Sequence, residues 1–154
     1  MSKDYWRTIE PFWDQIGLPD TAEEYLGRLA WVPTPIALLH AAHWVQSEVR
    51  NGGFGQFFDN PTGVLAPEAF RGLTAMGLPE CAATLSHAME KLGTPYPRDR
   101  KERRHRLNEI EPEVFNVLDD EFLALLEEEA SGFERAADSY SETIEQLRSD
   151  GVPL

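Results

Sequence analysis

Apolar side chains recur at helical spacing along most of this chain. Near the N-terminus, apolar residues stand three or four positions apart, and these are Ile9, Phe12, Trp13 and Ile16. This spacing places them on one face of an amphipathic helix, which we predict over about residues 4–16. Thr34-Pro35 is typical of a helix start, because proline fits the first turn. The helix that it opens is mainly apolar as far as Glu48, and we expect it to form the centre of the core.

Capping residues, prolines and glycines mark the other helix boundaries. Asp20 or Thr21 is suited to cap a short second helix that ends near Trp31. Asn51-Gly52-Gly53 is predicted to stop the long third helix at a tight corner, because glycine adopts positive φ at little steric cost. Two further helices have proline at the start and glycine after the end: one lies between Pro67 and Gly77, the other between Pro79 and Gly93.

The last third of the chain completes an all-α prediction. Amphipathic helices are predicted over about residues 112–129 and 132–148, and no stretch alternates apolar and polar residues as a strand would. The length of 154 residues fits one domain, residues 1–154. We therefore expect a single compact all-α domain of about eight helices, two of them acidic and C-terminal.

Negative charge is concentrated in these two C-terminal helices. The chain has 27 Asp and Glu residues against 14 Lys and Arg residues, a formal net charge of −13. Residues 109–154 alone contain 14 acidic and two basic residues, whereas residues 98–108 contain six basic and two acidic ones. A chain of this charge is repelled by polyanions, so we expect neither nucleic acid nor a membrane as a direct partner.

The acidic residues follow the outer faces of the two helices. At about 100° per residue, the inner face of the first helix consists of Val114, Leu118, Phe122 and Leu125. Eight carboxylates are the candidate partner-binding groups: Glu113, Asp120, Glu127 and Glu128 on the first helix, and Glu134, Asp138, Glu142 and Glu145 on the second. Like charges at helical spacing destabilise an isolated helix, so stability alone does not explain this arrangement. The alternative is an acidic face that only keeps the protein soluble.

Residues 48–60 form the most distinctive segment, Glu-Val-Arg-Asn-Gly-Gly-Phe-Gly-Gln-Phe-Phe-Asp-Asn. Its pattern Glu-x-x-Asn-Gly-Gly-Phe-x-Gln-Phe-Phe-x-Asn resembles the signature of the bacterial DNA-mimic protein family, whose type member is acidic and all-helical. The signature residues are Glu48, Asn51, Gly52, Gly53, Phe54, Gln56, Phe57, Phe58 and Asn60. The resemblance implies a protein whose carboxylates stand where DNA presents phosphates. Such a protein occupies the DNA site of a transcription regulator or nucleoid protein.

The residue types of the signature segment favour a structural role. Its phenylalanines have helical spacing and are expected to fill the core: Phe54, Phe57 and Phe58. Gln56, Asp59 and Asn60 are suited to bind the amides of a turn. The alternative interpretation makes part of the signature the polar walls of a small pocket, formed by Glu48, Asn51, Gln56 and Asn60.

Few residues indicate catalysis. Cys81 is the only cysteine, which excludes an internal disulfide and the cysteine-based zinc sites. His40 and His43 stand three apart on a predicted helix and could share a metal ion, but no third ligand has a matching spacing. The sequence has no dinucleotide-binding, P-loop or zincin motif. We therefore predict a non-enzymatic protein without cofactor or metal. The alternative is a small-molecule or metal-binding enzyme with a pocket at His40, His43, Glu48 and Asn51.

The basic run from Arg98 to Arg106 is interpreted as a cationic partner for the acidic helices, within the chain or across a homodimer. The N-terminus lacks the apolar stretch of a signal peptide and no 18 apolar residues run together, so we expect a cytoplasmic protein. Together these features predict a basic DNA-binding protein as the partner, and transcription regulation by protein–protein interaction. A plain interaction module of unknown role is the remaining alternative.

Overall fold

Helices make up the regular structure of residues 5–154, the part of the chain that the computed structural model describes. No strand occurs among these residues, which confirms the all-α prediction. The helices are α1 (Trp6–Ile16), α2 (Ala22–Leu29), α3 (Thr34–Asp59), α4 (Ala66–Ala75), α5 (Pro79–Glu90), α6 (Arg100–Asn108), α7 (Asn116–Glu128) and α8 (Phe133–Ser149). Short 3₁₀ segments stand between some of them: η1 (Pro61–Leu65), η2 (Pro112–Phe115) and η3 (Glu129–Ser131).

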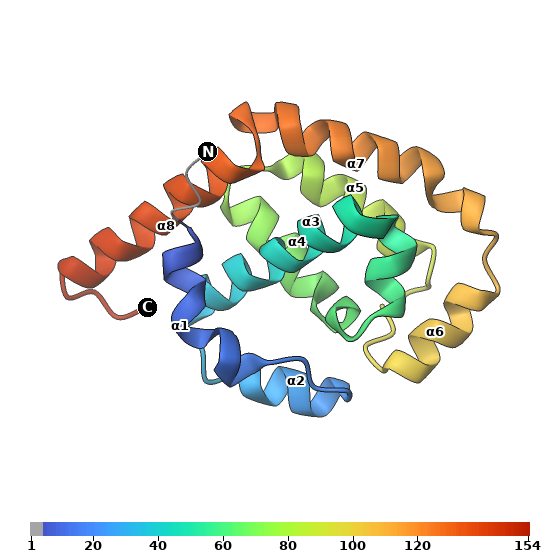
Figure 1. The fold of residues 1–154 in the computed structure, drawn as a ribbon, viewed down its shortest axis with the longest axis horizontal. Helices are drawn as coiled ribbons and strands as arrows, with labels where there is room; N and C mark the ends of the chain where they lie inside the picture. The colour runs from blue at the N-terminus through green and yellow to red at the C-terminus, as the bar shows by residue number, and fades with distance from the viewer. Residues whose placement is uncertain (1–4) are drawn as a thin grey trace.

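Helix α3 runs through the middle of the molecule, and the other helices surround it (Figure 1). Every residue from Ile36 to Ala42 is buried. Helix α3 packs against α1, α4, α6 and α7. A helix that is apolar on all sides must be covered on all sides, and the prediction that α3 forms the centre of the core is confirmed.

The glycines of the signature interrupt α3 and divide it into two helical stretches. Gly53 has a φ of 79°, in the left-handed region that glycine adopts readily, and the helix then continues to Asp59. The N–H of Phe54, the first beyond the bend, donates to Asp119 Oδ1 of α7 at 2.8 Å. The corner predicted at Asn51-Gly52-Gly53 is therefore confirmed, since Gly52 (φ −158°) and Gly53 are both non-helical. The backbone turns there, but an acceptor from a distant helix lets helical structure begin again.

The shorter helices begin and end close to the capping residues and glycines that predicted their boundaries. The Thr21 hydroxyl caps α2 and accepts the N–H of Glu24 at 3.2 Å. Gly77 and Gly93 have positive φ shortly after α4 and α5 end. The two proline-to-glycine helices are therefore confirmed.

The inner face of α7 matches the predicted one at Leu118, Phe122 and Leu125, which lie in or against the core, but not at Val114. Phe115, Phe122 and Leu126 are buried, whereas Val114 is 41% exposed. Residues 112–115 form η2, and a 3₁₀ segment turns by about 120° per residue instead of about 100°. A helical projection extended back to Val114 therefore assigns that side chain to the wrong face.

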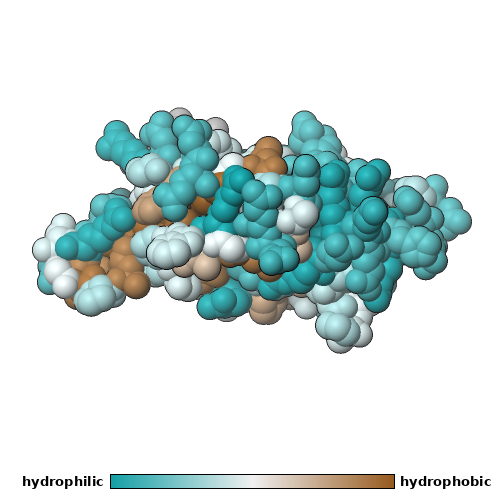
Figure 2. All heavy atoms as spheres, turned by 90° about the horizontal axis from the view of Figure 1, so that it is seen from below, coloured by the Kyte–Doolittle hydropathy of each residue, from teal (hydrophilic) through white to brown (hydrophobic). Residues whose placement is uncertain are grey.

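The two ends of the molecule differ in polarity. Figure 2 shows hydrophilic side chains over the end that carries α6, while hydrophobic atoms gather toward the opposite end. The hydrophilic end agrees with the composition of α6, in which Leu107 is the only apolar residue.

Candidate functional site

One carboxylate of the acidic C-terminal segment caps a distant helix. Glu129 accepts the N–H groups of Glu80 at 2.7 Å and Cys81 at 2.8 Å, at the start of α5. The first N–H groups of a helix have no partner inside it, and that end carries partial positive charge. Burial, with the Glu129 carboxylate nearby, also raises the pKa of the Cys81 thiol, which makes Cys81 a poor nucleophile.

Two more carboxylates of the same segment have a similar role. Asp119 binds the N–H of Phe54 beyond the bend in α3. Asp138 Oδ1 accepts the N–H of Tyr5, just before α1, at 2.9 Å. Burial raises the pKa of Asp119, and the hydrogen bond from Phe54 opposes that shift. These acidic residues therefore have a structural reason to be where they are, which sequence reasoning missed.

The eight candidate carboxylates fall into two groups. Six lie on exposed residues: Glu113, Asp120, Glu127, Glu128, Glu142 and Glu145. The Glu134 side chain is only 13% exposed, and Asp138 is half-buried. The sequence places all eight on outer faces, but Glu134 and Asp138 are covered by groups that approach α8 from α3 and from the start of α1.

Arg50 of α3 is the group that covers Glu134. Its guanidinium Nη1 lies 2.6 Å from Glu134 Oε1, and its Nη2 lies 3.4 Å from Glu127 Oε1. Arg50 thereby joins the end of α7 to the start of α8. Two candidate carboxylates are thus partly neutralised by a cation of the same chain.

A groove of about 870 Å³ lies where α7, η3 and α8 meet. Half of the candidate carboxylates line it: Glu127, Glu134, Asp138 and Glu142. The others do not contribute to its walls: Glu113, Asp120, Glu128 and Glu145. The structure therefore brings four of the eight predicted residues together and leaves four apart.

Glu48 organises the polar residues of the signature. Its buried carboxylate accepts hydrogen bonds from Gln56 Nε2 at 2.8 Å, Asn60 Nδ2 at 2.9 Å and Thr62 Oγ1 at 3.3 Å. Asn51 Nδ2 donates to Gln56 Oε1 at 3.1 Å. Gln56 and Asn60 therefore bind a carboxylate and not the turn amides that we expected.

The phenylalanines of the signature and the neighbouring Asp59 lie in different surroundings. Phe54, Phe57 and Phe58 are completely buried in the core. The Asp59 carboxylate binds Arg104 Nε at 3.0 Å instead of a turn amide. A cleft of about 540 Å³ is lined by Glu48, Asn51 and Gln56 together with Tyr5, His43 and Trp44 among others, but not by Asn60.

The two histidines have separate environments. His40 is 1% exposed, packs against Trp13 with ring centroids 5.4 Å apart, and its ring nitrogens have no hydrogen-bond partner within residues 5–154. Burial, and to a lesser extent His43, lowers the pKa of His40 to about 4. His43 Nδ1 lies 3.0 Å from the Tyr5 hydroxyl. No group of three or more His, Cys, Asp or Glu side chains in the described part of the chain is arranged to hold a metal ion.

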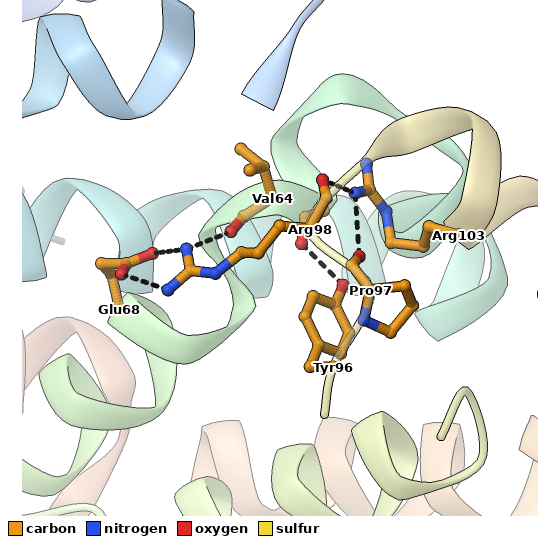
Figure 3. Close-up of polar contacts among 7 residues, drawn as sticks. Val64, Glu68, Tyr96, Pro97, Arg98 and Arg103 are labelled. Carbon is orange, nitrogen blue, oxygen red and sulfur yellow. Dashed lines mark hydrogen bonds and ion pairs between the residues drawn. The ribbon is translucent and has the colours of Figure 1, made fainter. Parts of the chain in front are cut away.

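The basic run binds the middle of the fold and not the acidic helices. Arg98 donates to both carboxylate oxygens of Glu68, at 2.7 and 2.9 Å, and to the Val64 carbonyl at 2.8 Å, as Figure 3 shows. Arg100 donates to the Asp59 carbonyl at 2.9 Å, and Arg106 to the Leu92 carbonyl at 2.9 Å. Within the chain, the interpretation of this run as the cationic partner of the acidic helices is therefore wrong, whereas its form across a homodimer stays a prediction. Its guanidinium groups instead bind helix-terminal carbonyls, where cations are favoured.

Arg103 is the most deeply placed residue of the run. It is completely buried, and its guanidinium donates to the carbonyls of Phe58 at 2.7 Å, Asn60 at 2.9 Å and Arg98 at 2.8 Å. Figure 3 shows this group directed at the segment around Pro97, whose carbonyl lies 3.4 Å from Nη1. Burial lowers the pKa of Arg103. The sequence does offer one indication that α6 is held by its charged side chains: the helix has almost no apolar residues. A helix without an apolar face must attach to the rest of the fold by other contacts.

One comparison with known proteins identifies a family for this chain. Within residues 5–154 no helix has the length and apolar character needed to cross a membrane. Neither a curated protein nor a solved structure matches the chain. The family model described as DMP19-like protein matches residues 31–147, a range that includes α3 and α7 and most of α8. The chain therefore belongs to the DMP19-like protein family.

Proposed function

We propose that this protein is a non-enzymatic DNA mimic. It binds a basic DNA-binding protein, a transcription regulator or nucleoid protein, and blocks the site at which that protein binds DNA. Membership of the DMP19-like family, a family of DNA mimics, supports this proposal. The observation that carries it is the row of exposed carboxylates along α7, a helix without any Lys or Arg of its own.

The mechanism is competition for the cations of the partner. The Arg and Lys side chains with which the partner neutralises DNA phosphates pair instead with carboxylates on a fixed helix. The negative field of residues 109–154 attracts the partner from a distance. Asp119 ties α7 to α3, and Glu129, directly after α7, ties its end to α5, so the helix is ordered before the partner arrives. Order in the free protein lowers the entropic cost of binding.

The two groups of carboxylates contribute differently to this surface. The six exposed carboxylates form the contact surface. Three of them lie on α7, which has no Lys or Arg of its own: Asp120, Glu127 and Glu128. Glu134 and Asp138 are already bound within the chain, so they contribute less.

The experiment removes exposed charges without touching the caps. A variant with Glu113→Gln, Asp120→Asn, Glu128→Gln and Glu142→Gln is compared with a control that loses four exposed carboxylates elsewhere: Glu10→Gln, Asp14→Asn, Glu23→Gln and Glu90→Gln. The native protein captures its partner from a lysate of its source at low salt, and the captured DNA-binding protein is purified. At roughly 0.5 kcal/mol per exposed ion pair, the first variant binds it about 30-fold more weakly.

Two results contradict the proposal. One is equal binding by the two variants, which have the same net charge. The other is a captured protein that binds its DNA and this protein at the same time, measured by anisotropy of labelled DNA. Thermal melting of both variants shows whether the fold is intact, and neutralising like charges at helical spacing is expected to leave it so.

One observation favours the alternative of a small-molecule site near the signature. Glu48, Asn51 and Gln56 do line a cleft, beside Tyr5, His43 and Trp44. A bound compound released from the purified protein on denaturation, and identified by mass spectrometry, is the result expected on this alternative.

A further inference from the structure

Exposed apolar side chains stand on the acidic helix α7 and on η2 just before it. Residues 5–154 have seven large hydrophobic side chains that are exposed, of which Val117 and Leu123 lie on α7 and Val114 lies on η2. Val117 is 74% exposed. Single exposed apolar residues are ordinary, but a surface that serves only solubility has charged residues at such positions.

Two exposed apolar residues on α7 lie in line, with carboxylates on both sides. Val117 and Ala124 are seven residues apart, which places them on nearly the same side of the helix and about 10.5 Å apart along its axis. Asp120 and Glu121 flank Val117, and Glu127 and Glu128 flank Ala124, with one carboxylate of each pair on either side of the line. We call these six residues the α7 seam. The opposite side of α7 is buried through Phe122 and Leu126, so the seam has a fixed orientation.

We propose that the α7 seam receives one amphipathic basic helix of the partner. Apolar residues seven apart on that helix pack on Val117 and Ala124, while Arg and Lys on both sides of them pair with the four carboxylates. This inference rests on the proposed function and names the part of the partner that binds. It fits a helix of the kind that DNA-binding proteins place in the major groove, where its cations otherwise meet phosphates.

The repeat of the seam selects a helix over an extended segment. A helical partner presents one face every seven residues, at the same interval of about 10.5 Å as the seam. An extended strand repeats a face at about 6.6 Å, so its side chains cannot stay in register with both apolar positions and both carboxylate pairs. Charge complementarity then sets the chemistry of the flanks, because α7 itself supplies only anions there.

The test uses the full chain and two synthetic helical peptides as probes. Both have the same composition of Leu, Arg, Lys and Ala, but only the first places its leucines seven apart between flanking cations. The protein variants are Val117→Ser, the control Val152→Ser, which changes another exposed valine, and the double neutralisation Asp120→Asn with Glu121→Gln. Binding is measured at about 50 mM salt, where electrostatic contacts are strong.

The expected results separate the inference from the proposed function. The in-register peptide binds more tightly than its isomer, and Val117→Ser weakens it roughly sixfold, the effect of removing most of a valine side chain from apolar contact. Val152→Ser changes nothing, and the double neutralisation weakens both peptides. If Val117→Ser is neutral and the peptides bind alike while neutralisation still weakens them, the seam is overturned and the proposed function stands. If neutralisation weakens neither peptide, the electrostatic basis of the proposed function is overturned as well.

Discussion

Replacing Arg103 by methionine tests whether the basic run anchors the fold. Methionine is unbranched and fills much of the space of the arginine stem, so the main loss is the guanidinium. Three hydrogen bonds of 2.7 to 2.9 Å disappear, to the carbonyls of Phe58, Asn60 and Arg98. These carbonyls lie beside a completely buried side chain, so water does not readily replace the lost donors.

The expected loss of stability follows from these contacts. The carbonyls of Phe58 and Arg98 lose their guanidinium donor at a cost of roughly 1–3 kcal/mol each, whereas the Asn60 carbonyl still accepts the N–H of Gly63 at 3.1 Å. Part of the cost is offset because a buried charge no longer has to be desolvated. We expect the free energy of unfolding to fall by about 4 kcal/mol, a large share of the roughly 5–15 kcal/mol that holds a typical domain folded.

Arg104 provides the matched control, because it stands next to Arg103 on α6 and loses the same charge. Its side chain is 53% exposed and pairs with an Asp59 side chain that is 44% exposed. The cost of Arg104→Met is therefore expected to stay below about 1 kcal/mol. Urea unfolding followed by far-UV circular dichroism compares the two variants, and a difference under about 1 kcal/mol between them refutes the reasoning. Arg103→Lys recovers only part of the loss, because one ammonium cannot reach three separate carbonyls.

Three further predictions concern single residues. Glu129→Gln removes the charge that caps α5 and lowers the unfolding free energy by about 1 kcal/mol, whereas Glu128→Gln leaves the melting temperature unchanged. Arg50→Gln removes a cation that pairs with Glu127 and Glu134, and we expect it to strengthen binding of a basic peptide, measured by calorimetry. Arg135→Gln is expected to do so to a smaller extent, and equal effects contradict this role of Arg50. The pKa of His40 is about 4 in the folded protein, below its ordinary value of 6.5. As the pH falls below 6.5 the unfolded chain therefore takes up a proton at His40 before the folded protein does. The free energy of unfolding is expected to fall by roughly 3 kcal/mol between pH 6.5 and about 4. His40→Phe should flatten this part of the stability profile, and an unchanged profile contradicts the assignment.

Most of the helices were predictable because their signals are local, but α6 was not predicted as a helix. Thr21 caps α2 through an amide three residues away, and Gly77 and Gly93 end the helices before them by their own backbone conformation. The apolar composition of residues 36–42 indicates burial without any knowledge of what surrounds them. The failure at Val114 was also local, since the sequence does not show that residues 112–115 form a 3₁₀ segment.

The roles of the charged residues were not predictable, because they depend on contacts between distant parts of the chain. Asp119, Glu129 and Asp138 bind amides between 48 and 133 positions away. A charge count treats these three carboxylates in the same way as Glu113 or Asp120. For the same reason the arginines of α6 were assigned to the acidic helices, although the end of α3 is nearer in the fold.

The caps divide the acidic residues of this chain by how they can change in evolution. Glu129 reaches two amides of α5 with both of its oxygens, and exchange for the shorter aspartate shortens that reach by one carbon–carbon bond. Asp120 and Glu128 are exposed, so exchange between aspartate and glutamate keeps their charge and disturbs no contact of this kind. Folding therefore constrains the identity of one class of acidic residue, whereas under the proposed function binding constrains only the charge of the other. The proposed binding surface can in this way drift to a new partner while the helices beneath it keep their places.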